Sequence, residues 1–188
     1  MELNNHKVVI FHGIDIEKNN KILRDIIESI KLDLDQIHIT EDIAILEKND
    51  LGINIIIDDQ IIQFDFKEDV HFTVIKEFFD QLRKARELEE YVCFYICQHN
   101  RELQKENLNG LIENSLEGIT LRMLGFDYQA ERHIYRVSTF LKDSILRSTL
   151  RIDFEIVNYV NLEKSILGIQ HELGESVIKE VYKFVGGN

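Results

Sequence analysis

Apolar and polar residues alternate along much of the first half of the chain, with the period of two that is typical of strands buried on one face. The run Lys7–Phe11 predicts a short apolar strand. Three further strands are predicted in succession, over Ile37–Ile45, Leu51–Ile57 and Ile62–Phe66. Residues 58–60, Asp-Asp-Gln, separate the last two of these strands and predict a tight polar turn.

Two segments of the first half instead have apolar residues at spacings of three and four, the pattern of an amphipathic helix. They predict helices over Glu17–Lys31 and Val70–Glu90. We expect Asp69 to be the N-cap of the second helix, because an aspartate there accepts hydrogen bonds from the first backbone N–H groups. The segment Tyr91–Cys97 fits either a fourth strand or a continuation of this helix.

The second half of the chain follows a similar order of elements. A helix is predicted over Arg101–Leu116, and the last segment, Leu162–Val185, predicts a long helix with one apolar stripe. Between them, strands are predicted over Ile119–Met123, His133–Leu141 and Leu150–Ile156. The pattern of His133–Leu141 also permits a helix.

Both halves can therefore be described as a helix, three strands and a helix. This order predicts an α+β fold, with antiparallel sheet covered by helices. Two organisations fit the pattern. The chain is either two similar tandem units, residues 1–98 and 99–188, or one single α+β domain over residues 1–188.

The composition narrows the range of functions. The 188 residues include 22 Lys and Arg against 34 Asp and Glu, a formal net charge of −12. This charge opposes binding to nucleic acid or an anionic membrane over a broad surface, and it favours a protein partner with a basic surface. The absence of Pro and Trp, together with abundant Ile, Asn and Lys, is typical of AT-rich bacterial or phage genomes.

Several features predict a cytoplasmic protein. No run of about 18 uncharged apolar residues is present, so no membrane-spanning helix is expected. The first residues lack the basic start and apolar run of a secretory signal. Two cysteines are too few for a disulfide framework in a chain of this length.

One motif suggests catalysis. Asp65-Phe66-Lys67 lies on a predicted strand, downstream of Asp58, and resembles the core of the restriction-endonuclease-like nucleases. The resemblance implies that two carboxylates hold Mg²⁺ while the lysine assists the attacking water. The sequence departs from that pattern at Asn54, where the family has its upstream carboxylate. The alternative interpretation is that Asp65 and Lys67 lie on the solvated face of an amphipathic strand.

Two other groups of residues are candidates for binding. Cys93 and Cys97, with His99 close by, have a spacing that zinc sites use, but the sequence lacks a second cysteine pair, so we expect two buried thiols and no metal. Arg132, His133 and Arg136 belong to the most basic stretch and could contact a small anion, as in a ligand-sensing regulator. Ordinary surface charge balance is the alternative.

The layout of helices and strands, combined with the acidity, resembles the small acidic chaperones of type III secretion. That resemblance implies a dimeric binding protein without catalytic residues or cofactors. We therefore expect a non-catalytic protein-binding module, such as an inhibitor, an immunity protein or a chaperone, that occludes a partner surface. The apolar stripe of the last predicted helix suggests that a homodimer could form through it. A Mg²⁺-dependent nuclease and an anion-sensing regulator are the alternatives.

Overall fold

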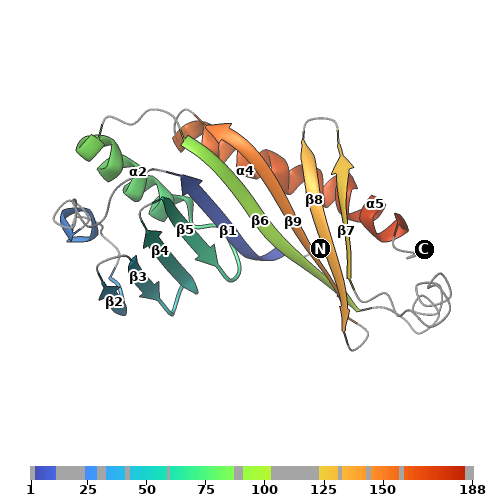
Figure 1. Cartoon of the computed structure of the whole chain (residues 1–188), viewed down its shortest axis with the longest axis horizontal. Helices are drawn as coiled ribbons and strands as arrows, with labels where there is room; N and C mark the ends of the chain where they lie inside the picture. The colour runs from blue at the N-terminus through green and yellow to red at the C-terminus, as the bar shows by residue number, and fades with distance from the viewer. Residues whose placement is uncertain are drawn as a thin grey trace. The chain divides into compact units, whose positions relative to one another are not determined.

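The computed structural model describes residues 3–11, 24–28, 33–40, 43–58, 60–86, 91–102, 123–130, 133–142, 145–156 and 159–184. Figure 1 labels the elements. The strands are β1 Leu3–Phe11, β2 Gln36–Ile39, β3 Ile43–Lys48, β4 Ile53–Asp58, β5 Ile61–Phe66, β6 Tyr91–Glu102, β7 Met123–Gln129, β8 Ile134–Lys142 and β9 Ile145–Ile156. The helices are α2 Phe72–Arg86, α4 Tyr159–Glu172, the π-helical turn η1 Leu173–Val177 and α5 Ile178–Phe184. Residues 24–28 are also helical.

The nine strands are hydrogen-bonded in the order β2-β3-β4-β5-β1-β6-β9-β8-β7. The predicted α+β fold with an antiparallel sheet is confirmed. Both halves of the chain place their first strand beside their last. In the first half β1 lies beside β5, and in the second half β6 lies beside β9. This order is consistent with two similar tandem units. The boundary predicted after residue 98 stays a prediction.

The chain divides by its contacts into two compact units. The β1–β5 unit comprises Asn4–Tyr95 and Asp153–Ser165. The β7–β9 unit comprises Met1–Leu3, Ile96–Ile152 and Ile166–Asn188. The strands β6 and β9 each contribute residues to both units.

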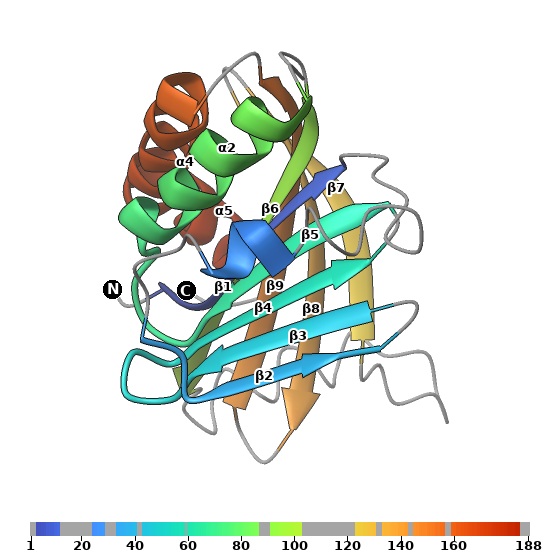
Figure 2. The same cartoon turned by 90° about the vertical axis from the view of Figure 1, so that its left-hand side faces the viewer.

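In the β1–β5 unit, α2 covers one face of the strands, which lie side by side (Figure 2). Alternate residues of β4 and β5 are buried on this face, as the period of two predicts. Phe78 of α2 meets Phe64 of β5 edge to face, with ring centroids 5.3 Å apart. Contacts of this kind stabilise the core by about 0.5–1.5 kcal/mol beyond the area that they bury.

Two predictions about this unit were wrong. The segment predicted as one strand over Ile37–Ile45 is a hairpin, because the hydroxyl of Thr40 and the backbone of Ile43 exchange hydrogen bonds at a turn. Asp69 is not the N-cap of α2, which begins at Phe72. The carbonyl of His71 accepts the first helical hydrogen bonds instead.

The strands of the second half decide between the helix and strand alternatives predicted there. Tyr91–Cys97 is part of a strand, and β6 continues through Arg101 and Glu102, where a helix was predicted. The strand predicted over His133–Leu141 is confirmed from Ile134 onward, and Leu150–Ile156 is confirmed as strand. The remainder of the helix predicted over Arg101–Leu116 lies outside the described residues. Residues 119–122 of the next predicted strand and most of the helix predicted over Glu17–Lys31 also lie outside them.

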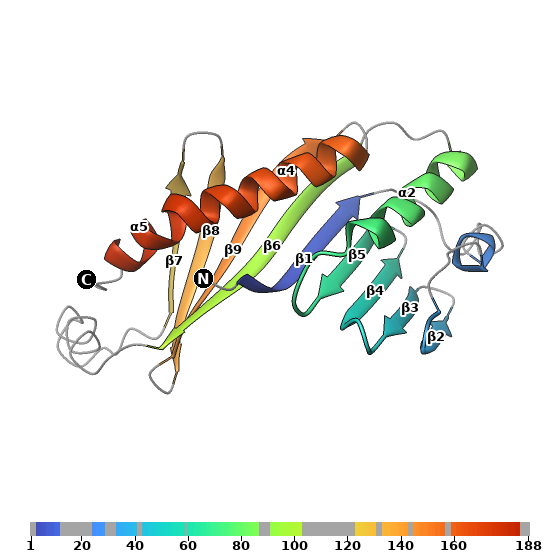
Figure 3. The same ribbon diagram turned by 180° about the vertical axis from the view of Figure 1, so that it is seen from behind.

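In the β7–β9 unit, η1, α5 and the second part of α4 lie along the strands (Figure 3). The predicted stripe is buried within the chain, with Ile166, Ile169, Leu173 and Val177 all 0% exposed. The expected homodimer through this helix stays a prediction, but the stripe that suggested it packs inside the fold. Among the described residues, no helix combines the length and apolarity needed to cross a membrane.

Candidate functional site

Asp65, the central residue of the nuclease-like motif, is engaged by its neighbours on the sheet. Lys7 of β1 lies opposite it, with Nζ 3.3 Å from Oδ1, and Gln63 donates from Nε2 to Oδ2 at 2.9 Å. Lys67 lies just past the end of β5, and its side chain passes over Gly52 at a turn. Asp65 is thus one member of a half-exposed ion pair.

The second carboxylate of that motif lies elsewhere. Asp58 closes the turn between β4 and β5, where its Oδ1 accepts hydrogen bonds from the backbone of Gln60 and Ile61, both at 2.8 Å. The residue opposite Asp65 on β4 is Asn54, four positions from Asp58, which corresponds to about 13 Å along a strand. The structure therefore does not bring Asp58 and Asp65 together. Asp59 lies outside the described residues.

Cys93, Cys97 and His99 all lie on β6 and point to its buried side. Both cysteines are 0% exposed, and His99 is 7% exposed. Burial raises the pKa of the Cys93 thiol, which keeps it protonated and unreactive. Four residues along a strand again separate the two sulfurs too widely for one metal ion. Within the described part of the chain, no group of three or more His, Cys, Asp or Glu side chains could hold a metal.

Each unit contains a buried histidine–tyrosine pair that no sequence pattern indicated. In the β1–β5 unit, a hydrogen bond of 2.5 Å joins His6 Nδ1 to the hydroxyl of Tyr95. In the β7–β9 unit, a hydrogen bond of 2.6 Å joins His99 Nδ1 to the hydroxyl of Tyr182. His6 and Tyr95 are 89 residues apart in sequence, and His99 and Tyr182 are 83 apart, so only the fold brings the partners together.

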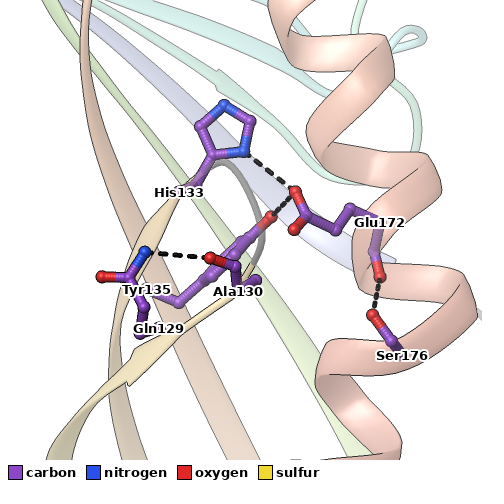
Figure 4. A network of polar contacts seen from close by, with 6 residues as sticks. All are labelled: Gln129, Ala130, His133, Tyr135, Glu172 and Ser176. Atoms are coloured by element: carbon purple, nitrogen blue, oxygen red, sulfur yellow. Dashed lines mark hydrogen bonds and ion pairs between the residues drawn. The ribbon is translucent and has the colours of Figure 1, made fainter.

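A second polar cluster surrounds Glu172 at the end of α4 (Figure 4). Its Oε2 accepts a hydrogen bond from the Tyr135 hydroxyl at 2.8 Å and lies 2.9 Å from His133 Nδ1. Burial, and then the neighbouring Glu172, raise the pKa of Tyr135, so this hydroxyl keeps its proton. Ser176 in the π-helical turn donates to the Glu172 carbonyl at 3.2 Å.

The contacts of this cluster hold two elements of the fold together. A histidine oriented by a carboxylate is one part of a nucleophilic triad, but here the adjacent hydroxyl belongs to Tyr135 and is bonded to the same carboxylate. The cluster joins the start of β8 to the end of α4. A pattern search could not find it, because Tyr135 and Glu172 lie 37 residues apart.

The residues proposed for anion binding are not assembled around one point. His133 contacts Glu172, on the same side of β8 as the buried Tyr135. Arg136 follows Tyr135 directly, and the alternation of the strand places it on the opposite, exposed face. Arg132 lies outside the described residues.

The face of the β1–β5 unit opposite α2 is a further candidate for binding. We call it the isoleucine face. The register places half-buried or exposed apolar side chains next to one another on it: Phe11, Ile43, Ile45, Ile56 and Ile61. Glu47, Asp58 and Asp65 lie among them on the same face, with Lys7 paired to Asp65.

The isoleucine face is accessible and partly apolar. Phe11 is 41% exposed and also contacts Phe94 of β6, with ring centroids 5.8 Å apart. Ile45 and Ile56 stand opposite each other in the centre, on β3 and β4. An apolar sheet face that reaches solvent is typical of interaction surfaces. No protein-family model and no curated protein matches this sequence.

Proposed function

We propose that this protein is a non-catalytic binding module that covers a surface of a partner protein with its isoleucine face. The observation that carries the proposal is the combination of exposed Phe11 and four half-buried isoleucines with carboxylates on that face. Phe11 and the isoleucines supply area that a partner can remove from water, at roughly 25 cal/mol per Å². Glu47 and Asp58 favour a partner whose contact surface is basic.

The state of the candidate catalytic groups supports a binding role. Asp65 is held by Lys7 and Gln63, and Asp58 stabilises a turn. In the cluster around Glu172, the polar groups of Tyr135 and His133 both contact the Glu172 carboxylate. Each of these groups therefore has a structural role that accounts for its position.

The mechanism of such a module is occlusion. The sheet holds the face in a fixed shape, so little conformational entropy is lost when the partner docks. Apolar anchors such as Phe11 would dominate the affinity, as buried aromatic residues do at protein interfaces. The carboxylates would increase the association rate through long-range attraction, which weakens as salt is added.

The experiment compares capture of partners by the wild type and by a variant of the isoleucine face. Phe11→Ser combined with Ile56→Thr removes two anchors, and threonine keeps the β-branched shape that suits a strand. The matched control is Leu167→Ser, since Leu167 is 49% exposed on α4. Immobilised proteins are incubated with host lysate, and captured proteins are quantified by mass spectrometry.

We expect a partner that the wild type and Leu167→Ser retain equally and that the double variant binds at least tenfold more weakly. Glu47→Lys should slow association with the purified partner at low salt and leave the dissociation rate nearly unchanged. Circular dichroism checks that each variant is folded. Equal binding by the folded double variant would contradict the proposal.

A second assay addresses the nuclease directly. We expect neither the wild type nor Asp65→Ala to degrade nucleic acid in the presence of Mg²⁺. Degradation by the wild type that Asp65→Ala abolishes would overturn the proposed function.

A further inference from the structure

The β7–β9 unit presents a second exposed surface, of a different chemical character. Alternation along β8 and β9 sends three arginines and three large apolar side chains to the face opposite the buried residues. We call it the arginine face, and it comprises Ile134, Arg136, Phe140, Ile145, Arg147 and Arg151. Ile134, Phe140 and Ile145 are 55%, 41% and 44% exposed.

The centre of this face is Arg147. It lies directly opposite Phe140 in the register of β8 and β9, and its Nε donates to Asn100 Oδ1 of β6 at 3.3 Å. Among the described residues, it has no carboxylate partner. The bond to Asn100 orients the guanidinium and leaves its terminal nitrogens available, beside an exposed aromatic ring.

Two of the three arginines, Arg136 and Arg151, stand opposite each other on β8 and β9, and Arg147 differs from Arg136 in its other neighbours. Arg136 has Asp127 opposite it on β7, whereas the neighbours of Arg147 are Phe140 and a neutral amide. A guanidinium offers a planar pair of donors that matches a carboxylate. Arginine and aromatic residues are also the types enriched at the centres of protein interfaces.

Other occupants fit this face less well. A second copy docked across a two-fold axis would bring the arginines of both copies together, which is unfavourable. A nucleic acid would place a run of phosphates close to a chain with a net charge of −12. A short protein segment carries fewer charges and can also cover the aliphatic Ile134 and Ile145.

We propose that the arginine face binds an acidic, apolar segment of a partner protein. A carboxylate of that segment pairs with Arg147, and a neighbouring apolar side chain packs on Phe140 and Ile145. This surface is distinct from the isoleucine face, so the two proposals can fail separately.

The test uses the full chain and a fluorescently labelled peptide of alternating glutamate and leucine as the probe. Binding is measured by fluorescence anisotropy at about 0.15 M salt, where the Debye length of about 8 Å screens the repulsion between distant charges. The variants are Arg147→Glu, Arg147→Lys and Phe140→Ala. The control is Arg83→Glu, which makes the same charge change at an exposed position of α2.

We expect the wild type and Arg83→Glu to bind the peptide with similar affinity. Arg147→Glu should weaken binding at least tenfold, and Arg147→Lys should weaken it less, because the charge is kept while the planar pair of donors is lost. Phe140→Ala should also weaken binding. Thermal melting checks that each variant is folded.

Three results would overturn the proposal. The first is a wild type that does not bind the peptide. The second is a folded Arg147→Glu variant that binds as well as Arg83→Glu. The third is a single-stranded RNA oligomer that binds more tightly than the peptide and loses affinity in Arg147→Glu, because that result would assign the face to nucleic acid.

Discussion

Two glycines occupy positions with opposite conformational requirements. Gly52 lies in the turn before β4 with φ +61°, in the left-handed region, and a Cβ there would lie 3.1 Å from Cβ of Lys67. Gly168 lies inside α4 on its exposed side, and a Cβ there would meet nothing within 4 Å. The first position requires glycine, whereas the second loses helix stability because of it.

The same substitution should therefore have opposite effects at these two sites. Gly168→Ala should raise the free energy of unfolding by up to about 1 kcal/mol, because alanine restricts the unfolded chain and favours helix. Gly52→Ala should lower it by about 1–2 kcal/mol or more, through left-handed strain and the contact with Lys67. Urea denaturation measures both changes. A Gly52→Ala variant as stable as the wild type would contradict the turn geometry.

The buried hydroxyl of Tyr135 makes stability depend on alkaline pH. An unfolded tyrosine has a pKa of about 10, and in the fold burial and Glu172 raise the pKa of Tyr135 above that value. The folded state therefore holds this proton more tightly than the unfolded state. The resulting stabilisation is complete below about pH 10 and is lost as the pH rises further.

Tyr135→Phe should reduce this loss of stability above about pH 10. The variant should also be less stable at neutral pH, by about 1–3 kcal/mol, because the hydrogen bond to Glu172 is removed. Unfolding free energies measured from about pH 8 to pH 11 for both proteins test the prediction. Parallel curves over that range would show that Tyr135 does not cause the pH dependence.

At the scale of elements, α4 shows which side of a helix is buried and which is exposed. Ile169 is 0% exposed on the side of the helix that packs into the core, whereas Leu167, two residues earlier, is 49% exposed. Both are large aliphatic residues on one helix, so residue type alone does not show which of them is buried. Their position relative to the apolar stripe shows it.

Ile169→Ala should lower the free energy of unfolding by about 2–5 kcal/mol, because it removes buried methyl groups and leaves a cavity. Leu167→Ala should change it by no more than about 0.5 kcal/mol. Chemical denaturation of the two variants in parallel makes the comparison. Similar losses at both positions would mean that the helix is rotated relative to the fold described here.

The elements whose apolar residues follow a strict period could be predicted from the sequence. The elements that depend on a reversal of the chain direction at a turn could not. β4 and β5 follow the predicted alternation throughout, and β9 follows it over residues 150–153. Ile37 and Ile45 have the same parity in sequence, so one strand was predicted, but the turn at Thr40 sends them to opposite faces. The end of β6 carried a helical pattern, and pairing within the sheet overrode it.

At the scale of the whole molecule, the composition indicated an acidic chain rich in isoleucine but did not indicate where these side chains gather. The excess of carboxylates over basic groups was evident, and so was the abundance of isoleucine. That Ile45, Ile56 and Phe11 share one face with Glu47 depends on the register of separate strands. The cluster around Glu172 and the placement of Arg147 beside Phe140 likewise depend on residues distant in sequence.

Hydroxyl-radical footprinting of the protein, with and without the partner that it captures, tests directly whether the isoleucine face is the binding surface. If the isoleucine face binds the partner, labelling of Phe11, Ile56 and Ile61 falls sharply in the complex, while exposed Val160 and Leu167 of α4 are labelled as before. Unchanged labelling of Phe11 and Ile56, with protection on α4 instead, would show that the isoleucine face is not the binding surface.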